Sequence, residues 1–409
     1  MGLLSDRSEF ALNPIEEENV LARKLALKGM KIVGLNKGDP PKYFPTPRYV
    51  IDAYVRALRE SRTTYSGIKD ENVLKDAVQR RYKRAYNIRL KEEDIVITAG
   101  VSEAISFLNS ALINKGDIGI LFRPYYTIYA SMLKMNEGRI QLEDYDEGDS
   151  WNVHVDNLRK SLSSMRRSGR IKKVKYMMIT NPNNPTGTVL RRKILEEIAD
   201  IANEYGILLI SDEIYDEIVY NGAKLTSVGQ VAKGIPHVIL NGASKVYDAT
   251  GFRVGFAMVP GDDKVSNALK AALDNYALVR LSVNNPALYA VAEAMRNETE
   301  HKKAIRHMVS EIEKRVNLSS KLLAENPHLE TVEPNGAFYT LPRVHLSDLG
   351  MKTDAEFVET LLRETGIDVT RGSGFGAPSH FRIVSLPPKE ILGYAINRIN
   401  DFCRRHSVK

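Results

Sequence analysis

The chain has 409 residues, a hydrophobic content of 43% and a formal net charge of +7. Its length allows two or more domains with sizeable cores. The single cysteine, Cys403, excludes an intrachain disulfide framework and suits a reducing cytoplasm. Met1–Arg7 has no signal-peptide core and no apolar run approaches membrane-spanning length, so we expect a cytoplasmic protein without a membrane partner. The positive charge permits attraction to small anionic ligands or to polyanions.

The N-terminal part predicts a loop followed by a helix. Prolines interrupt the segment from Leu35 to Pro47 and exclude a helix there, and Gly38 is placed for a close approach of the backbone to another group. Helical spacing follows from Tyr49 to Glu60. We interpret residues 1–47 as an N-terminal arm that includes part of a small domain.

Short apolar strands then alternate with helices. Strands are predicted at residues 95–98, 118–122, 174–179, 207–210, 238–240 and 256–259, and helices at residues 102–113 and 195–205. This alternation predicts βαβ units with a mostly parallel sheet, in a large domain over residues 48–285. In such sheets, chemistry takes place in loops at the carboxyl ends of the strands.

After about residue 285 the pattern changes. A long charged helical stretch is predicted at residues 286–326, with strands at 337–341 and 381–385 and helices at 354–365 and 389–405. We interpret residues 286–409 as a small C-terminal α+β domain. The expected fold class is therefore α/β, with a large domain and a smaller α+β domain.

Two strand ends carry charged residues of interest. Lys245 lies just past the apolar run Val238–Leu240, among small residues that leave it little room to reach water. Such a lysine can have a depressed pKa and attack carbonyl groups, although an ordinary surface lysine is the alternative. Arg253 follows eight residues later. Asp212 comes directly after four apolar residues, so its carboxylate should lie deep and need a partner, unless it simply caps a helix.

Three other strand ends supply polar or aromatic groups. The small residues of Thr98–Ala104 leave backbone N–H groups free for an anion at a helix start, while Ser102 could simply cap that helix. The aromatic residues of Arg123–Tyr129 could form a stacking platform or pack in the core. The turn Asn181–Gly187 presents three asparagines as amide donors, although turn chemistry also explains them.

In combination these stretches resemble a known family. Asn-Pro-Asn-Asn-Pro-Thr-Gly at 181–187, Ser-Asp-Glu-Ile-Tyr at 211–215 and Ser-Lys at 244–245 followed by Thr-Gly-Phe-Arg-Val-Gly resemble the class I/II aminotransferases of the fold-type I pyridoxal-phosphate enzymes. The likeness extends from about Leu35 to the C-terminus and includes Pro334–Tyr339. The segment Arg371–Pro388 looks most like archaeal alanine/aspartate-type aminotransferases.

The resemblance implies pyridoxal 5′-phosphate as the cofactor and assigns residues to its ring. Lys245 would form the Schiff base and then shuttle a proton between the substrate and the cofactor. Asp212 would pair with the protonated pyridine nitrogen. Tyr215 and Asn184 would hydrogen-bond to the 3′ oxygen, and Tyr126 would stack on the ring.

The resemblance also assigns residues to the cofactor's phosphate. Backbone N–H groups of Gly100, Val101 and Ser102 would bind it, together with the guanidinium of Arg253. Tyr65 matches the tyrosine that reaches the phosphate of the other subunit in these dimers. A homodimer is therefore expected.

The substrate would be held by four residues. Arg382 would grip its α-carboxylate in a bidentate manner, with Asn184 beside it and Gly38 in contact through backbone. Arg280 falls where other branches of the family place a substrate-side arginine from the partner subunit. An interface ion pair is the alternative role for Arg280.

Two positions depart from the family pattern. Many relatives have serine or threonine three residues before the lysine, where this chain has Gly242, so one hydrogen bond to the phosphate is lost. Some relatives have a basic residue near the position of Ser102 that binds the distal carboxylate of a dicarboxylate. The serine argues against a strict preference for aspartate.

The implied activity is transfer of an amino group from an L-amino acid, with alanine or aspartate favoured, to 2-oxoglutarate by a ping-pong mechanism through pyridoxamine phosphate. The alternatives are a lyase, decarboxylase or racemase with the same cofactor, an aminotransferase of aromatic or broad donor specificity, and a non-enzymatic polyanion binder. The expected partners are amino acids, 2-oxo acids and a second copy of the chain. No nucleic acid is expected, because no aromatic residues interleave with the basic run at residues 166–173. No metal site is expected, because histidine and cysteine form no cluster.

Overall fold

The computed structural model describes residues 14–408, so Met1–Arg7 lies outside the described residues. Its main sheet has eight strands: β2 (Ile95–Thr98), β3 (Ile118–Arg123), β4 (Arg139–Asp146), β5 (Asn152–Val153), β6 (Val174–Thr180), β7 (Leu208–Asp212), β8 (His237–Gly242) and β9 (Gly255–Met258). Their order is β2-β9-β8-β7-β6-β3-β4-β5. Neighbours from β4 to β8 run parallel, whereas β9 is antiparallel to β2 and β8, and β5 to β4. The prediction of a mostly parallel sheet is confirmed.

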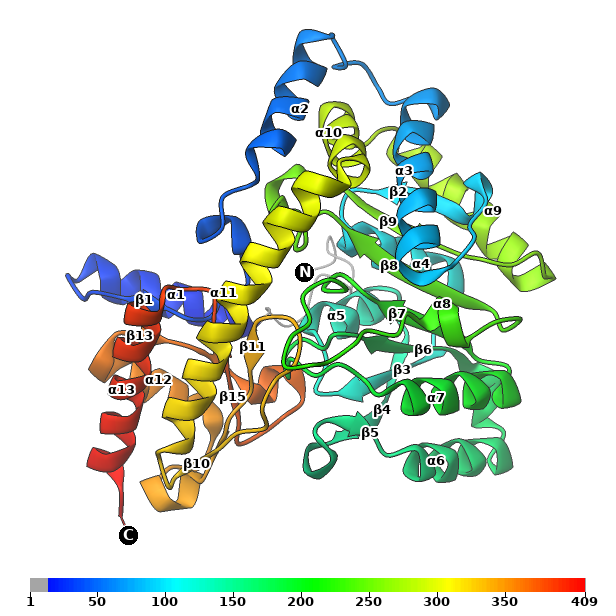
Figure 1. Cartoon of the computed structure of the whole chain (residues 1–409). Helices are drawn as coiled ribbons and strands as arrows, with labels where there is room; N and C mark the ends of the chain where they lie inside the picture. The colour runs from blue at the N-terminus through cyan, green and yellow to red at the C-terminus, as the bar shows by residue number, and fades with distance from the viewer. Residues whose placement is uncertain (1–13, 409) are drawn as a thin grey trace, which may run out of the picture.

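Helices surround this sheet and continue beyond it (Figure 1). The α-helices are α1 (Pro14–Leu27), α2 (Arg48–Arg59), α3 (Ile68–Tyr86), α4 (Val101–Leu112), α5 (Thr127–Met135), α6 (Val155–Arg167), α7 (Arg192–Tyr205), α8 (Val228–Val231), α9 (Lys264–Arg280), α10 (Asn285–Arg296), α11 (Glu298–Ala324), α12 (Asp354–Thr365) and α13 (Lys389–His406). The helices α1, α3, α5, α6, α8 and α9 are not among the predicted elements.

Three small sheets lie apart from the main sheet. Strand β1 (Val33–Gly34) pairs in parallel with β13 (Ile367–Asp368). The other pairings join β11 (Tyr339–Thr340), β15 (Phe381–Val384) and β14 (Thr370–Arg371) into a three-stranded sheet, and β10 (Leu329–Glu330) to β12 (Arg343–Val344). Figure 1 shows these strands with α1, α12 and α13 on one side of the molecule. The pairing of β1 with β13 joins the N-terminal arm to the C-terminal part.

The domain boundaries at residues 47/48 and 285/286 remain predictions. Helix α10 packs against α2 and α3, and α11 packs against α13. In Figure 1, α11 runs from the region of α10 towards the small sheets.

Two predictions need correction. The stretch 286–326 is two helices, because Asn297 ends α10 and its side chain caps α11 by accepting a hydrogen bond from the Glu300 N–H. The segment 35–47 contains a short 3-10 turn at Pro40–Lys42. Proline is tolerated in the first turn of a helix, where its missing N–H would have no acceptor anyway.

Strand register brings the functional loops together. Gly255 at the start of β9 lies opposite Thr98 at the end of β2 and opposite Gly242 at the end of β8. Asp212 at the end of β7 lies beside Thr180 at the end of β6. The loops that follow four of these strands therefore meet at one edge of the sheet, as expected for a parallel sheet.

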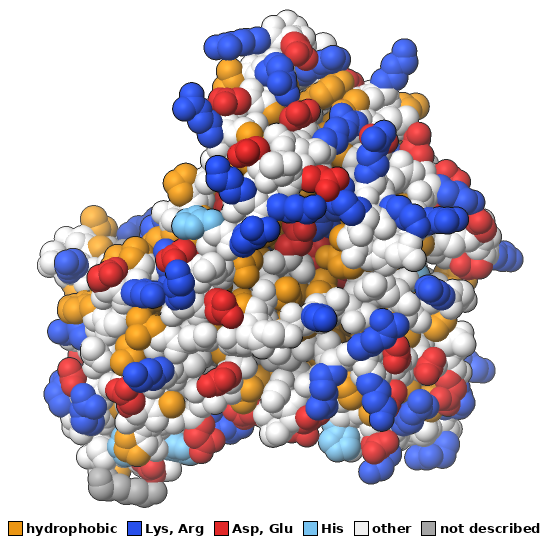
Figure 2. Space-filling model, in the orientation of Figure 1, with side chains coloured by type: hydrophobic (Ala, Val, Ile, Leu, Met, Phe, Trp, Pro, Cys, Tyr) orange, Lys and Arg blue, Asp and Glu red, His pale blue; other side chains and the backbone are white. Residues whose placement is uncertain are grey.

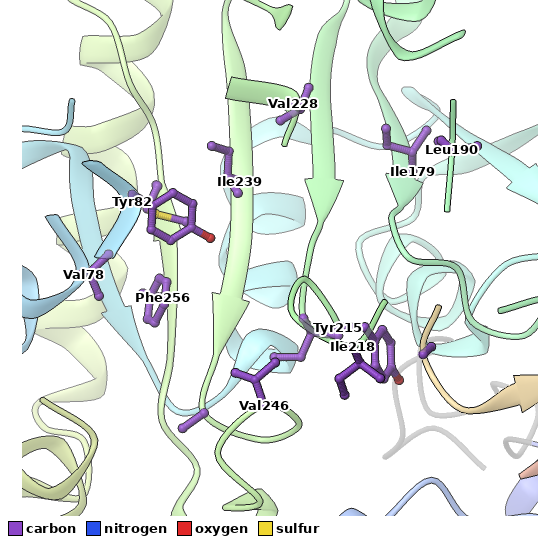
Figure 3. Packing of buried hydrophobic residues seen from close by; sticks show 14 of the residues in the cluster. Val78, Tyr82, Ile179, Leu190, Tyr215, Ile218, Val228, Ile239, Val246 and Phe256 are labelled. Atoms are coloured by element: carbon purple, nitrogen blue, oxygen red, sulfur yellow. The ribbon is translucent and has the colours of Figure 1, made fainter. Parts of the chain in front are cut away.

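Buried side chains fix these loops. Val246, next to Lys245, is 3% exposed, and Tyr215 is 4% exposed. Figure 3 shows Val246 just beyond the end of the strand that carries Ile239, with Tyr215 and Ile218 close by. Burying a side chain of this size stabilises the fold by about 1.5–3 kcal/mol, so the loops are held by the core itself.

Both ends of the basic run at residues 166–173 make contacts within the chain. Arg166 lies over the ring of Tyr205 at 4.0 Å, and Lys173 pairs with Asp117. The run spans the end of α6 and a 3-10 turn. On the face shown in Figure 2, Lys and Arg side chains are interspersed with Asp and Glu. Within residues 14–408, no group of histidine, cysteine or acidic residues could hold a metal ion, and no helix is long and apolar enough to span a membrane.

Candidate active site

A cavity of about 450 Å³ lies where the strand ends meet. It is lined by most of the predicted site residues, namely Gly38, Val101, Ser102, Tyr126, Asn184, Asp212, Tyr215, Lys245, Arg253 and Arg382. They come from the segments that follow β1, β2, β3, β6, β7 and β8, from the last residue of β7 and from β15. Segments that are far apart in the sequence therefore form a single site.

Lys245 lines the cavity from the segment between β8 and β9. Its Nζ donates a hydrogen bond of 2.7 Å to the carbonyl of Gly38. Burial lowers the pKa of Lys245 to about 8, and the nearby guanidinium groups of Arg382 and Arg253 add to the effect, while Asp39 opposes it. Lys245 is therefore not an ordinary surface lysine, and a substantial fraction of its amine is neutral near pH 8.

Asp212 ends β7 and is 4% exposed. The Tyr129 hydroxyl donates a hydrogen bond of 2.7 Å to it, and the Ile214 N–H donates one of 3.1 Å. Burial raises the pKa of Asp212 to about 6, although these two bonds act in the opposite direction. No helix begins directly after Asp212, so the alternative of a helix cap is wrong. A buried carboxylate of this kind favours a cation in the cavity.

The start of α4 and Arg253 form a corner of the cavity that suits an anion. Gly100 caps the helix with a φ of 79°, and a Cβ at this position would collide with the guanidinium of Arg253. Arg253 donates to the carbonyls of Thr250 and Ala99 at 3.0 and 3.3 Å. Ser102 lies inside the first turn, so it does not cap the helix. First-turn N–H groups lack helical acceptors, and together with Arg253 they suit a phosphate.

The presence of glycine at position 242 has a structural reason. A Cβ there would lie 2.6 Å from the Val254 carbonyl oxygen and 2.9 Å from the Gly255 Cα. The close pairing of β8 with β9 therefore leaves no room for serine or threonine. The hydroxyl of Ser244, which also lines the cavity, accepts a long hydrogen bond of 3.5 Å from Arg253.

Arg382 lines the same cavity from β15 and is 1% exposed. It donates to the Asn184 side-chain oxygen at 2.8 Å and to the Asn36 carbonyl at 2.6 Å. Its guanidinium also lies over the ring of Tyr339 at 4.8 Å, and its Nε has no hydrogen-bond partner within the described chain. A buried guanidinium with spare donor capacity suits a carboxylate.

Two tyrosines of the site were not predicted. Tyr129 orients Asp212 and also contacts the hydroxyl of Thr180 at 2.9 Å. The hydroxyl of Tyr339 lies 2.8 Å from that of Tyr215. Both tyrosines fall in stretches whose likeness to the family was noted, but residue type alone does not indicate these contacts.

Tyr65 and Arg280 lie outside the cavity. Tyr65 is 78% exposed. Arg280 is turned towards its own chain, with its guanidinium donating to the Ile97 carbonyl at 3.3 Å and lying 3.8 Å from Glu103. Gly100 does not line the cavity but shapes it by admitting Arg253.

The family follows from the sequence as a whole. A model of the family "Aminotransferase class I and II" matches residues 30–399. The chain belongs to the class I and II aminotransferases. It is 31% identical over 392 residues to an asparagine–oxo-acid transaminase of Streptococcus mutans, covering 94% of both chains. It is 30% identical over 390 residues to an aspartate aminotransferase of Bacillus subtilis, covering 94% of this chain and 95% of that one.

The fold of this aminotransferase is also known from solved structures. An alanine aminotransferase from Pyrococcus furiosus superposes with a TM-score of 0.91 at 33% identity, over 98% of this chain and 100% of the other. Class I and II aminotransferases use pyridoxal 5′-phosphate. The cavity fits this cofactor, because the buried carboxylate of Asp212, the Lys245 amine with its lowered pKa, and Arg253 beside the first turn of α4 all line it.

Proposed function

We propose that this aminotransferase moves an amino group from L-alanine or L-aspartate to 2-oxoglutarate by a ping-pong mechanism. The observation that carries the proposal is the convergence of Lys245, Asp212 and Arg382 on one cavity. These groups supply a base, a counter-ion for a cationic ring and a clamp for a carboxylate. The similarity to enzymes named for asparagine, aspartate and alanine supports donors with small side chains.

The chain's residues hold the cofactor at both ends. Arg253 and the first turn of α4 would bind the phosphate, while Asp212 would pair with the ring nitrogen. Tyr215 and Asn184 would contact the 3′ oxygen, with Tyr126 against the ring. When bound, pyridoxal 5′-phosphate supplies an electron sink for the charge that develops at the substrate's Cα.

Lys245 serves as the base. With a pKa of about 8, its amine can take the Cα proton and return it, and the Gly38 carbonyl orients the Nζ. A positioned general base contributes about 10²–10⁴-fold to a rate. Because Asp212 is buried, its carboxylate interacts more strongly with a cation than it would in water.

Arg382 sets the orientation of the substrate. Its bonds to Asn184 and Asn36 fix the guanidinium plane, which leaves its remaining N–H groups for the α-carboxylate. A substrate held in this way presents its Cα towards Lys245, because both groups line the same cavity.

A single-turnover experiment tests the reaction class. Loaded enzyme mixed with alanine or aspartate, without an acceptor, should release one oxo acid per active site and then stop until 2-oxoglutarate is added. A lyase or decarboxylase would continue to turn over without an acceptor. A panel of alanine, aspartate, aromatic and branched donors then identifies the preferred donor. An aromatic or branched preference contradicts the proposed donors.

We also propose a homodimer. Large apolar side chains gather on one exposed surface, where the Ser66 N–H binds the Ser282 hydroxyl at 2.8 Å and joins two segments. These largely exposed residues are Tyr65, Ile68, Leu278, Val279 and Leu281. Such a patch is typical of an interaction surface. In this proposal Tyr65 reaches the phosphate site of the second subunit, in a protein that resides in the cytoplasm.

Light scattering tests the dimer. The wild-type chain should have the mass of two copies, and Leu278→Asp should shift it to one copy and weaken cofactor binding. A fully active wild-type monomer would contradict the proposal. The substrate role of Arg280 remains a prediction. Its side chain is 14% exposed, so it would have to leave Ile97 and Glu103 to enter the partner's cavity.

A further inference from the structure

The cavity contains one cation that the proposed reaction does not use. The basic residues that line it, within the described chain, are Lys37, Lys245, Arg253 and Arg382. Lys245 is the base, Arg253 holds the phosphate and Arg382 binds the α-carboxylate. The proposed reaction assigns no function to Lys37.

The backbone around Lys37 is anchored on both sides. The carbonyl of Asn36 accepts a hydrogen bond from Arg382 at 2.6 Å, and the carbonyl of Gly38 accepts one from Lys245 at 2.7 Å. The residues on either side of Lys37 therefore hydrogen-bond to the substrate clamp, Arg382, and to the base, Lys245. Its attachment point is fixed relative to the place where a substrate must lie.

The side chain of Lys37, by contrast, is free. It is exposed, and it makes no ion pair or side-chain hydrogen bond to residues 14–408 within bonding distance. The two exposed acids of the cavity wall do not pair with it, since Asp39 accepts a hydrogen bond from Thr250 at 2.6 Å and Glu16 makes no ion pair with it. A flexible ammonium group at a cavity wall suits a carboxylate that arrives with a ligand.

The chemistry of the proposed acceptor calls for such a group. 2-Oxoglutarate carries a second carboxylate, and its desolvation in a partly buried site is favourable only with a cationic partner. Ser102 is uncharged, and Arg280 is engaged by its own chain. Resting on the proposed function, we propose that Lys37 binds the distal carboxylate of dicarboxylate substrates while Arg382 holds the α-carboxylate, which makes Lys37 a specificity-determining residue of this site.

Lys37 also has a neighbour whose charge it affects. Burial raises the pKa of Asp368 to about 7, and Lys37 opposes that rise. A test must therefore separate ligand binding from a structural effect of the charge. Lys37→Met removes the ammonium and keeps the alkyl stem, whereas Lys37→Arg keeps the charge. Lys42→Met is the matched control, because it removes an exposed lysine of the same loop that does not line the cavity.

The first measurement is binding of two non-reacting acids to the loaded enzyme by calorimetry, namely the dicarboxylate glutarate and the monocarboxylate butyrate. In Lys37→Met the Kd for glutarate should rise about tenfold relative to the Kd for butyrate, because a charge-assisted hydrogen bond to the second carboxylate is lost. The ratio of the two Kd values should be restored in Lys37→Arg and unchanged in Lys42→Met. Equal weakening for both acids, or no change in the ratio, would overturn the proposal.

The second measurement separates this inference from the proposed function. The ratio of kcat/KM for 2-oxoglutarate to kcat/KM for pyruvate should also fall about tenfold in Lys37→Met. A wild-type enzyme that turns over pyruvate but not 2-oxoglutarate contradicts the proposed acceptor. If its glutarate binding still depends on Lys37, the dicarboxylate site stands and only the identity of the acceptor is wrong.

Discussion

Arg382 and Asn184 are 198 residues apart in the sequence and meet through a hydrogen bond of 2.8 Å. Arg382 lies on a strand of the three-stranded sheet, and Asn184 lies in the turn that follows β6 of the main sheet. The bond therefore joins the two sheets at the point where substrate and cofactor would meet. A ligand that binds Arg382 therefore contacts a residue that is hydrogen-bonded to Asn184, which lines the same cavity.

Replacing Arg382 with lysine should lower kcat/KM for amino acids and oxo acids alike. Lysine keeps the charge but cannot donate to Asn184, Asn36 and a carboxylate from one plane. The loss of a charged, bidentate contact corresponds to about tenfold to hundredfold. Steady-state kinetics with one donor and one acceptor measures the change. Unchanged KM values for both substrates would contradict the proposed clamp.

Replacing Tyr129 with phenylalanine should weaken cofactor binding. The variant removes the hydrogen bond to Asp212, which holds its carboxylate in place and lowers its pKa. Because one such bond is lost, the Kd for pyridoxal 5′-phosphate should rise about threefold to tenfold. Equilibrium dialysis measures this constant. Tyr125→Phe, four residues earlier, before the start of α5 and outside the cavity, is the control and should bind as the wild type does.

Replacing Glu18 with glutamine should remove part of the pH dependence of stability. Burial raises the pKa of Glu18 to about 8, against about 4.5 in the unfolded chain. The folded protein therefore holds a proton that the unfolded chain releases, so this contribution to stability is fully present below about pH 4.5 and is lost as the pH rises through about 8. Glutamine stays neutral and can still accept from the Arg371 N–H.

Thermal unfolding at pH 5.5 and pH 8.5 tests this effect. The Tm of Glu18→Gln relative to the wild type should be higher at pH 8.5 than at pH 5.5 by a few degrees. Asp368, whose pKa burial raises to about 7, should keep some pH dependence in the variant. A Tm difference that is the same at both pH values would show that Glu18 titrates normally.

Three of the predicted site residues share one property. Asp212, Asn184 and Lys245 each follow an apolar strand within a few positions, so the sheet alone brings them to one edge. Contacts between segments that are distant in the sequence were not predictable in this way. Tyr339 is 124 residues from Tyr215 in the sequence and comes from another sheet, so only tertiary packing places their hydroxyl groups together.

The same distinction applies to the fold. Strands with continuous apolar runs, such as β6 and β7, were predicted nearly to their ends, because burial on both faces leaves a clear pattern. The two-residue strands β1 and β13 have no such pattern. Their pairing depends on residues more than 300 positions apart, and it places Asn36 and Lys37 beside the cavity.

We propose that Lys245 forms the covalent link to the cofactor. Enzyme loaded with pyridoxal 5′-phosphate can be reduced with borohydride, which fixes that link, and then digested and analysed by mass spectrometry. The cofactor mass should appear on the peptide that contains Lys245. Lys245→Ala should bind the cofactor noncovalently and should not turn over substrate. A cofactor fixed to Lys37 or another lysine, or near-normal turnover in Lys245→Ala, would contradict the account.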